Sequence, residues 1–112
     1  MQLQKAIAEL ELTVLTGHDN LECEITGGYV SDLLSNVMGQ IEAGNIWITM
    51  QVHQNIVAVA SLAGVPAILI AGNAQVGQDT LQKAEKEGLV LLATNMSCFE
   101  AAGRLYELGV GK

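Results

Sequence analysis

The second half of the chain alternates apolar, strand-like runs with helical patterns, and this order limits the possible folds more than any other feature. In chain order, the expected elements are a strand at residues 46–50, a helix at 54–63, a strand at 67–71, a helix at 79–87, a strand at 89–93 and a helix at 97–108. Strands separated by helices form parallel sheets with right-handed crossovers. We therefore predict an α/β fold, a three-layer domain with a mostly parallel sheet.

The first half of the chain is expected to extend the same sheet. Residues 2–9 suit a short helix, and residues 12–16 are rich in β-formers. Residues 21–26 alternate apolar and acidic side chains, which predicts a half-exposed strand that stops at a Gly-Gly pair. The chain has the length of one domain, so residues 1–112 are interpreted as a single domain.

The net charge of −7 excludes several classes of partner. Five residues are Lys or Arg, and none of them lies between Lys5 and Lys83. Nucleic acids and anionic membranes are bound by clusters of such residues. We therefore expect no nucleic-acid partner and no membrane surface, and any phosphate held by the middle of the chain must rely on backbone N–H groups.

Composition also bears on assembly and location. Charged residues make up 15% of the chain, against about 25% in typical domains, and the helix predicted at residues 54–63 has no polar face. Both features indicate a surface covered by a second subunit, so we expect a homodimer. Cys23 and Cys98 fit neither a disulfide framework nor a zinc motif. The apolar segment 56–72 is too short to span a membrane and no signal sequence is visible, so a cytoplasmic location is expected.

A Gly-Gly pair before a helix is the first candidate ligand site. Gly27 and Gly28, followed by a helix capped at Ser31, have the order of an anion-binding turn at a helix N-terminus. Tyr29 offers a ring that could stack on a base, and Asp32 would repel an anion or hold a cation. The alternative interpretation is a tight turn followed by an ordinary helix cap.

The second candidate site follows the strand at residues 67–71. Gly72 and Asn73 leave the carboxyl end of that strand, where ligands bind in open α/β sheets. Gly77 is followed by Gln78, so the Lys and hydroxyl residue of a phosphate-binding P-loop are missing and phosphoryl transfer has no support. The alternative here is a plain connecting loop.

Two isolated side chains are candidates for catalysis. His53 follows a strand end and could act as a general base, although it equally suits a helix N-cap. Cys98 lies at a helix start, where a thiolate would be stabilised, although free cysteines are more often buried and inert. Neither has an identifiable partner residue, so no catalytic set, metal site or cofactor is expected.

Several motifs together resemble the DRTGG domain family, which is similar to the N-terminal domain of HPr kinase/phosphorylase. The resemblance covers nearly the whole chain and is carried by residues 26–34, 47–49, 53–60, 67–72 and 99–105. Gly28 and Tyr29 stand in place of the family's Asp-Arg pair, and residues 71–73 (Ala-Gly-Asn) replace its Thr-Gly-Gly.

The resemblance implies a non-catalytic regulatory or interaction module that dimerises and binds a partner protein or a small metabolite such as a nucleotide. The tentative ligand-binding residues are Gly27, Gly28, Tyr29, Ser31, Asp32, His53, Gly72 and Asn73. Two alternatives stay open at this point, a small enzyme that uses His53 or Cys98 and a structural subunit of a larger complex.

Overall fold

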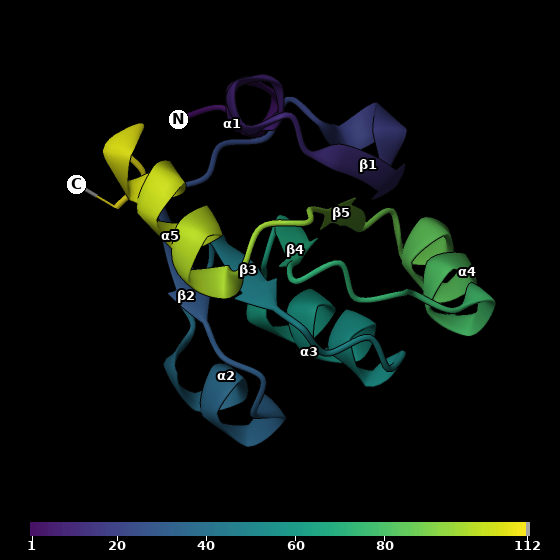
Figure 1. Cartoon of the computed structure of the whole chain (residues 1–112). Helices are drawn as coiled ribbons and strands as arrows, with labels where there is room; N and C mark the ends of the chain where they lie inside the picture. The colour runs from purple at the N-terminus through teal and green to yellow at the C-terminus, as the bar shows by residue number, and fades with distance from the viewer. Residues whose placement is uncertain (112) are drawn as a thin grey trace.

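A computed structural model describes residues 1–111 and shows the predicted α/β architecture (Figure 1). The elements are α1 (Leu3–Leu10), β1 (Thr13–Thr16), β2 (Gly27–Val30), α2 (Leu34–Gln40), β3 (Asn45–Thr49), α3 (Asn55–Ala63), β4 (Ala67–Ile70), α4 (Gln78–Glu87), β5 (Val90–Ala93) and α5 (Cys98–Glu107). The five strands form one sheet in the order β1-β5-β4-β3-β2. Strands β2 to β5 pair in parallel and β1 pairs antiparallel with β5, which confirms the mostly parallel sheet.

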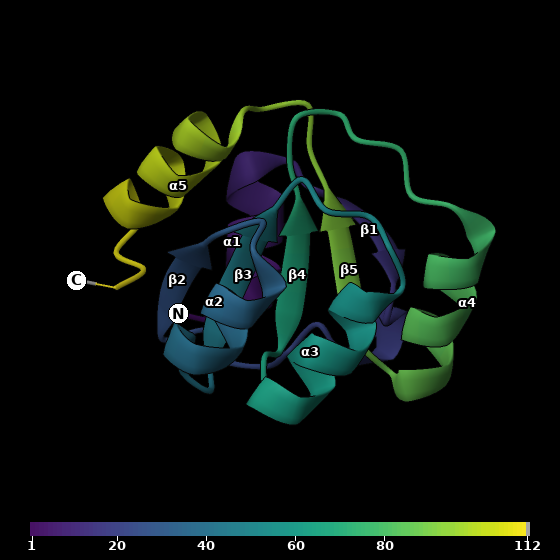
Figure 2. The ribbon, with the colours of Figure 1, turned by 90° about the horizontal axis from the view of Figure 1, so that it is seen from below.

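The sheet is covered on both faces, because its central strands are apolar on both sides. Side chains alternate along β3: Ile46 and Ile48 pack toward α1 and α5, whereas Trp47 packs toward α2, α3 and α4. Strands β4 and β5 divide their side chains in the same way between these two apolar clusters. The parallel arrows of Figure 2 point to one common edge of the sheet, and the loops after β3, β4 and β5 cross this edge.

The strand predicted at residues 21–26 is wrong. The structure has a single bridge there, between Gln2 and Glu24, and the strand β2 begins at Gly27 instead. The alternation arises because the segment lies along the N-terminus: the Ile25 N–H donates to the Met1 carbonyl at 2.8 Å, and the Ile25 side chain is buried with α1. Gly27 and Gly28 are therefore strand residues that pair with β3, and they form no turn.

The helix predicted at residues 54–63 is confirmed as α3, and within this chain it is buried on one side only. One side of α3 packs on the sheet, but Ala58, Ser61 and Leu62 are exposed, and Leu62 is 80% accessible. Ala58 and Leu62 keep the outer side of α3 largely apolar although it is exposed in this chain. Within residues 1–111, no helix has the length and apolarity needed to cross a membrane.

Candidate ligand-binding site

The carboxyl ends of β2 to β5 bring the loops that follow them to one edge of the sheet (Figure 2). Ligands of open α/β sheets bind outside this edge. The predicted residues Ser31, Asp32, His53, Gly72 and Asn73 all lie in these loops or directly after them. Five of the candidate residues thus lie at this edge, although they do not form a single cluster.

The loop after β4 is held in an unusual conformation by the loop after β5. Gly72 and Asn73 both have positive φ, 70° and 57°. The Gly72 N–H donates to the Met96 carbonyl at 2.7 Å, and the Asn73 N–H donates to the Thr94 carbonyl at 3.1 Å. Because these N–H groups are already paired, they cannot replace missing cations around a phosphate, and that expectation for Gly72 and Asn73 is wrong.

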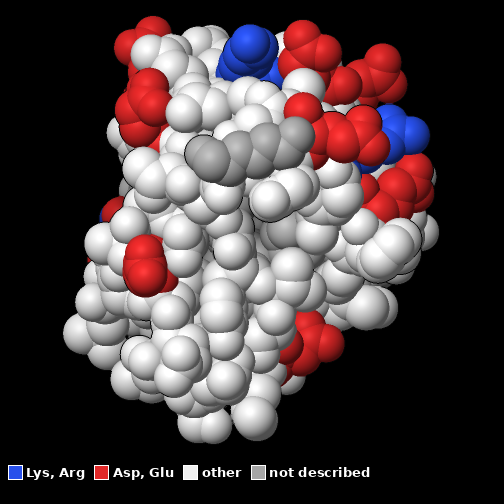
Figure 3. Space-filling view, turned by 90° about the vertical axis from the view of Figure 1, so that its left-hand side faces the viewer, with Lys and Arg blue, Asp and Glu red and all other residues white. Residues whose placement is uncertain are grey.

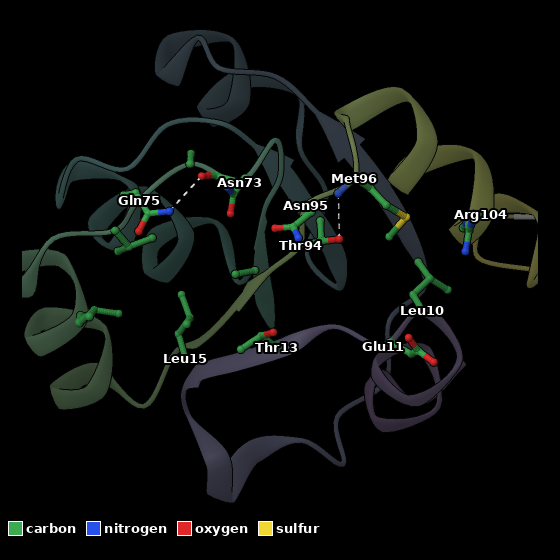
Figure 4. A pocket seen from close by; sticks show the side chains of 14 residues that line it. Leu10, Glu11, Thr13, Leu15, Asn73, Gln75, Thr94, Asn95, Met96 and Arg104 are labelled. Atoms are coloured by element: carbon green, nitrogen blue, oxygen red, sulfur yellow. Dashed lines mark hydrogen bonds between the residues drawn. The ribbon is translucent and has the colours of Figure 1, made fainter.

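A groove of about 510 Å³ lies beside this loop pair (Figure 4). Its lining comes from the end of α1, the strand β1, the loops after β4 and β5, and one residue each of α4 and α5. The lining residues are Leu10, Glu11, Thr13, Leu15, Asn73, Ala74, Gln75, Val76, Leu81, Ala93, Thr94, Asn95, Met96 and Arg104. The volume is that of a small-molecule site, which typically measures about 300–1,000 Å³.

The groove offers hydrogen-bonding groups that the fold does not use. Within residues 1–111, the side-chain amides of Asn73 and Asn95 make no hydrogen bond, and neither does the Thr13 hydroxyl. The Gln75 side chain is partly used, because its Nε2 donates to the Asn73 carbonyl at 3.2 Å. The Thr94 hydroxyl accepts from the Met96 N–H at 3.2 Å, which shapes the loop after β5.

Charge in the groove is nearly balanced. Arg104 is the one cationic side chain among the described lining residues, and its Nη2 lies 3.1 Å from a carboxylate oxygen of Glu100. Glu11 adds a carboxylate to the lining. Arg104 is exposed, as expected for the last helix, so this ion pair contributes little to stability.

The side chains of Ser31 and Asp32 accept hydrogen bonds from other groups of the chain. One carboxylate oxygen of Asp32 accepts from the Thr49 hydroxyl at 2.7 Å and from the Met50 N–H at 2.8 Å, which ties the loop after β2 to the end of β3. The Ser31 hydroxyl accepts from the Leu33 N–H at 3.1 Å. Helix α2 begins at Leu34 with no side-chain cap, so the predicted Ser31 cap is wrong.

Gly27, Gly28 and Tyr29 are separated from the other candidates. Gly27 and Gly28 lie at the amino end of β2, beside a shallow hollow that also contains Asn45. A Cβ atom at Gly27 would lie 2.8 Å from Nδ2 of Asn45, at the end of that side chain. The Tyr29 hydroxyl donates to the Asn36 side chain at 2.6 Å. The predicted glycine turn at a helix N-terminus is therefore wrong.

His53 lies just before helix α3, in agreement with the structural role at the helix start that the sequence also allowed. Its Nδ1 accepts from the Asn55 N–H at 3.1 Å, and its carbonyl accepts from the Ile56 N–H at 3.1 Å. His53 thus provides acceptors for two N–H groups in the first turn of α3. The imidazole lines a shallow hollow with Asp79 and makes no other hydrogen bond within residues 1–111. This geometry contains no nucleophile activated by His53.

Cys98 lacks the activation that a catalytic thiol needs. Burial raises the pKa of the Cys98 thiol above its ordinary value, and the nearby carboxylate of Asp32 raises it further. A raised pKa leaves less thiolate at neutral pH, which is the opposite of the stabilisation expected for a thiolate at a helix N-terminus. Among residues 1–111, no group of His, Cys, Asp and Glu side chains could hold a metal ion.

Comparison with known proteins identifies the kind of domain. Residues 4–108 match the DRTGG domain. The chain belongs to the DRTGG domain family. A solved structure of similar fold contains the CBS and DRTGG domains of the regulatory region of Clostridium perfringens pyrophosphatase, complexed with the activator diadenosine tetraphosphate. The TM-score is 0.70 at 16% sequence identity, and the match covers 93% of this chain and 45% of that one. No curated protein matches this chain.

The comparison confirms the family that the sequence resembles. The fold is that of a DRTGG domain, and in the solved structure such a domain belongs to the regulatory region of an enzyme. The chain spans less than half of that solved chain, which also contains CBS domains.

Sequence reasoning missed most of the groove. Thr94 and Asn95 could have been found, because they follow the carboxyl end of β5 as Gly72 and Asn73 follow β4. Thr13 and Leu15 could not, because they reach the groove only through the antiparallel pairing of β1 with β5, which no local pattern indicates.

Proposed function

We propose that this DRTGG domain is a non-catalytic regulatory module that binds a small metabolite in the groove beside the loops after β4 and β5. The groove carries this proposal, because it combines the usual position for a ligand with side-chain amides that have no partner in the fold. The enzyme alternative gains nothing from the geometry, since His53 starts a helix and Cys98 has a raised pKa. The activator bound by the similar pyrophosphatase region supports a regulatory role.

A thermal-shift screen of metabolites tests this proposal. A compound that binds the folded protein raises its Tm. We expect at least one compound to raise the Tm of the wild-type protein and to lose this effect in Asn95→Ala, whose side chain is exposed and makes no hydrogen bond in the fold. The matched control is Asn55→Ala in α3, away from the groove, which should respond like wild type. Compounds that stabilise all three proteins equally would contradict the groove as the site.

The outer edge of β2 supports self-association. β2 is the last strand of the sheet and its outer side has no partner strand within residues 1–111. Such edges are usually protected by charges or proline, because free backbone groups pair readily with another strand. Here Val30 is 48% accessible, and beside the edge lies a hollow of about 220 Å³ whose described lining carries no charged side chain.

Repulsion between two copies of this chain would be least at the uncharged part of that face. Two molecules of net charge −7 repel one another wherever carboxylates meet. Seen from the side of β2, α5 and α2, the charged side chains gather toward one end and much of the remaining face is uncharged (Figure 3). Phe99 on α5, 90% accessible, and Leu33 after β2, 64% accessible, add apolar surface. We propose a symmetric homodimer through this face.

Analytical ultracentrifugation tests the dimer. At micromolar concentration the wild-type protein should sediment at twice its mass of 11.8 kDa. Val30→Lys places a charge on the β2 edge and should shift the protein to monomer, whereas Leu62→Lys on the exposed side of α3 should leave the dimer intact. A wild-type monomer, or a dimer lost equally in both variants, would contradict this interface.

Three finer expectations belong to the same proposal. A cytoplasmic location and a likeness to the N-terminal domain of HPr kinase/phosphorylase rest on the sequence alone. A partner enzyme, which the metabolite-bound module would regulate, is suggested by the regulatory region of the similar structure.

A further inference from the structure

The free hydrogen-bonding groups of the groove form two facing sets. The amides of Asn73 and Asn95 come from the loops after β4 and β5, and Thr13 lies across from them on β1 (Figure 4). Each amide presents a donor beside an acceptor. The positive φ of Asn73 fixes the direction in which its loop leaves the sheet, and such uncommon backbone conformations gather at ligand sites. The polar part of the groove therefore matches a ligand edge on which donors and acceptors alternate.

The rest of the lining suits a flat ligand. Leu15, Val76, Leu81 and Met96 are half-buried and add apolar surface to the groove. Sites of this size combine such apolar walls with a few polar groups that fix the orientation of the ligand. A planar heterocycle could lay its faces on the apolar side chains and turn its polar edge to the amides.

The charge of the groove disfavours phosphates. Arg104 is held by Glu100, Glu11 contributes a negative charge, and the N–H groups of Gly72 and Asn73 are already paired. The whole chain carries a net charge of −7. A polyphosphate in this groove would meet one exposed cation that is shared with Glu100, the Glu11 carboxylate and the net negative charge of the chain, whereas an uncharged ligand meets no such repulsion.

We propose that the groove binds the uncharged purine base of a nucleoside and disfavours the corresponding nucleoside polyphosphates. Asn side chains bond the adjacent donor and acceptor of adenine in pairs, which makes an adenine-type base the closest chemical match. This inference rests on the proposed function, and it specifies the class of ligand. It also separates this chain from the similar pyrophosphatase region, whose activator is a dinucleoside tetraphosphate.

Isothermal titration with adenosine and with ATP, at equal ionic strength, tests the inference. Adenosine should bind more tightly than ATP. Asn73→Gly removes one amide and keeps the positive φ accessible, and Asn95→Ala removes the other. Each variant should weaken adenosine binding by roughly tenfold, which is typical for the loss of a paired base contact. Asn55→Ala in α3 should bind adenosine as wild type does.

A charge-reversal variant tests the exclusion of phosphate separately. Glu11→Lys replaces an exposed carboxylate of the lining by a cation, so it should strengthen ATP binding and leave adenosine binding nearly unchanged. ATP binding more tightly than adenosine to the wild type would overturn the inference, and so would adenosine binding that neither Asn variant weakens. If adenosine does not bind at all but another metabolite stabilises the protein through Asn95, this inference fails and the proposed function stands.

Discussion

Gly72 shows how a single residue shapes the groove. Its φ of 70° turns the chain out of β4 toward the loop after β5, and a Cβ atom there would lie 2.8 Å from the Cε atom of Met50. Gly103, in contrast, lies inside α5 with open space around it. The two glycines therefore differ in what they contribute to stability, as expected for one residue after a strand and one inside a helix.

The Gly72→Ala variant should lower the free energy of unfolding by about 1–2 kcal/mol, the cost of a left-handed conformation for a residue with a Cβ atom. Gly103→Ala should raise it by up to about 1 kcal/mol, because alanine favours a helix interior over glycine. Urea denaturation of both variants measures these changes. Equal effects at the two positions would show that the loop conformation is not required for the native state.

Cys98 gives a second test at the scale of one residue. Burial and the Asp32 carboxylate disfavour the thiolate, so the pKa is raised and alkylation should stay slow until the pH exceeds the ordinary pKa of a cysteine. Iodoacetamide rates against pH, measured on Cys23→Ser, report this midpoint. Asp32→Asn should move the midpoint to lower pH because it removes the nearby charge. A midpoint below that of a free cysteine would revive the enzyme alternative.

Helix α5 depends on one cap at its start. The Ser97 hydroxyl accepts from the Glu100 N–H at 3.1 Å, while the Glu100 carboxylate pairs with Arg104. Ser97→Ala should therefore destabilise the protein by about 1 kcal/mol. Ser61→Ala, at an exposed position of α3 without a side-chain bond, serves as the control. Thermal unfolding measures both, and an unchanged Tm in Ser97→Ala would show that the cap is dispensable.

For helices and strands, the signals that end a helix could be read from the sequence, but the pairing of strands in the sheet could not. Gly64 and Gly88 end α3 and α4 with positive φ, at the positions predicted from the sequence. The position of β2 was missed because Gly27 becomes a strand residue only by pairing with Asn45 of β3. The same limit applies to the groove, where Asn73 follows from a rule about strand ends but Thr13 depends on β1 joining β5.

At the scale of the whole molecule, the two proposed surfaces lie at different places on the sheet. The groove involves β1, β4 and β5, whereas the proposed dimer contact follows β2 at the far end of the strand order. Dimerisation through β2 should thus leave the groove open, and each protomer should bind its own ligand. The geometry fits a module whose ligand and partner contacts are made by separate surfaces.

The central claim, that this domain binds a metabolite in the groove, is tested most directly by amide NMR during a ligand titration. We predict shifts centred on residues 73–76 and 94–96 and on the facing part of β1, saturating at one ligand per protomer. The shifts should be lost in Asn95→Ala and retained in the monomeric Val30→Lys variant. Shifts centred instead on β2 or on the exposed side of α3, or the absence of a saturable response to any metabolite that raises the Tm, would contradict it.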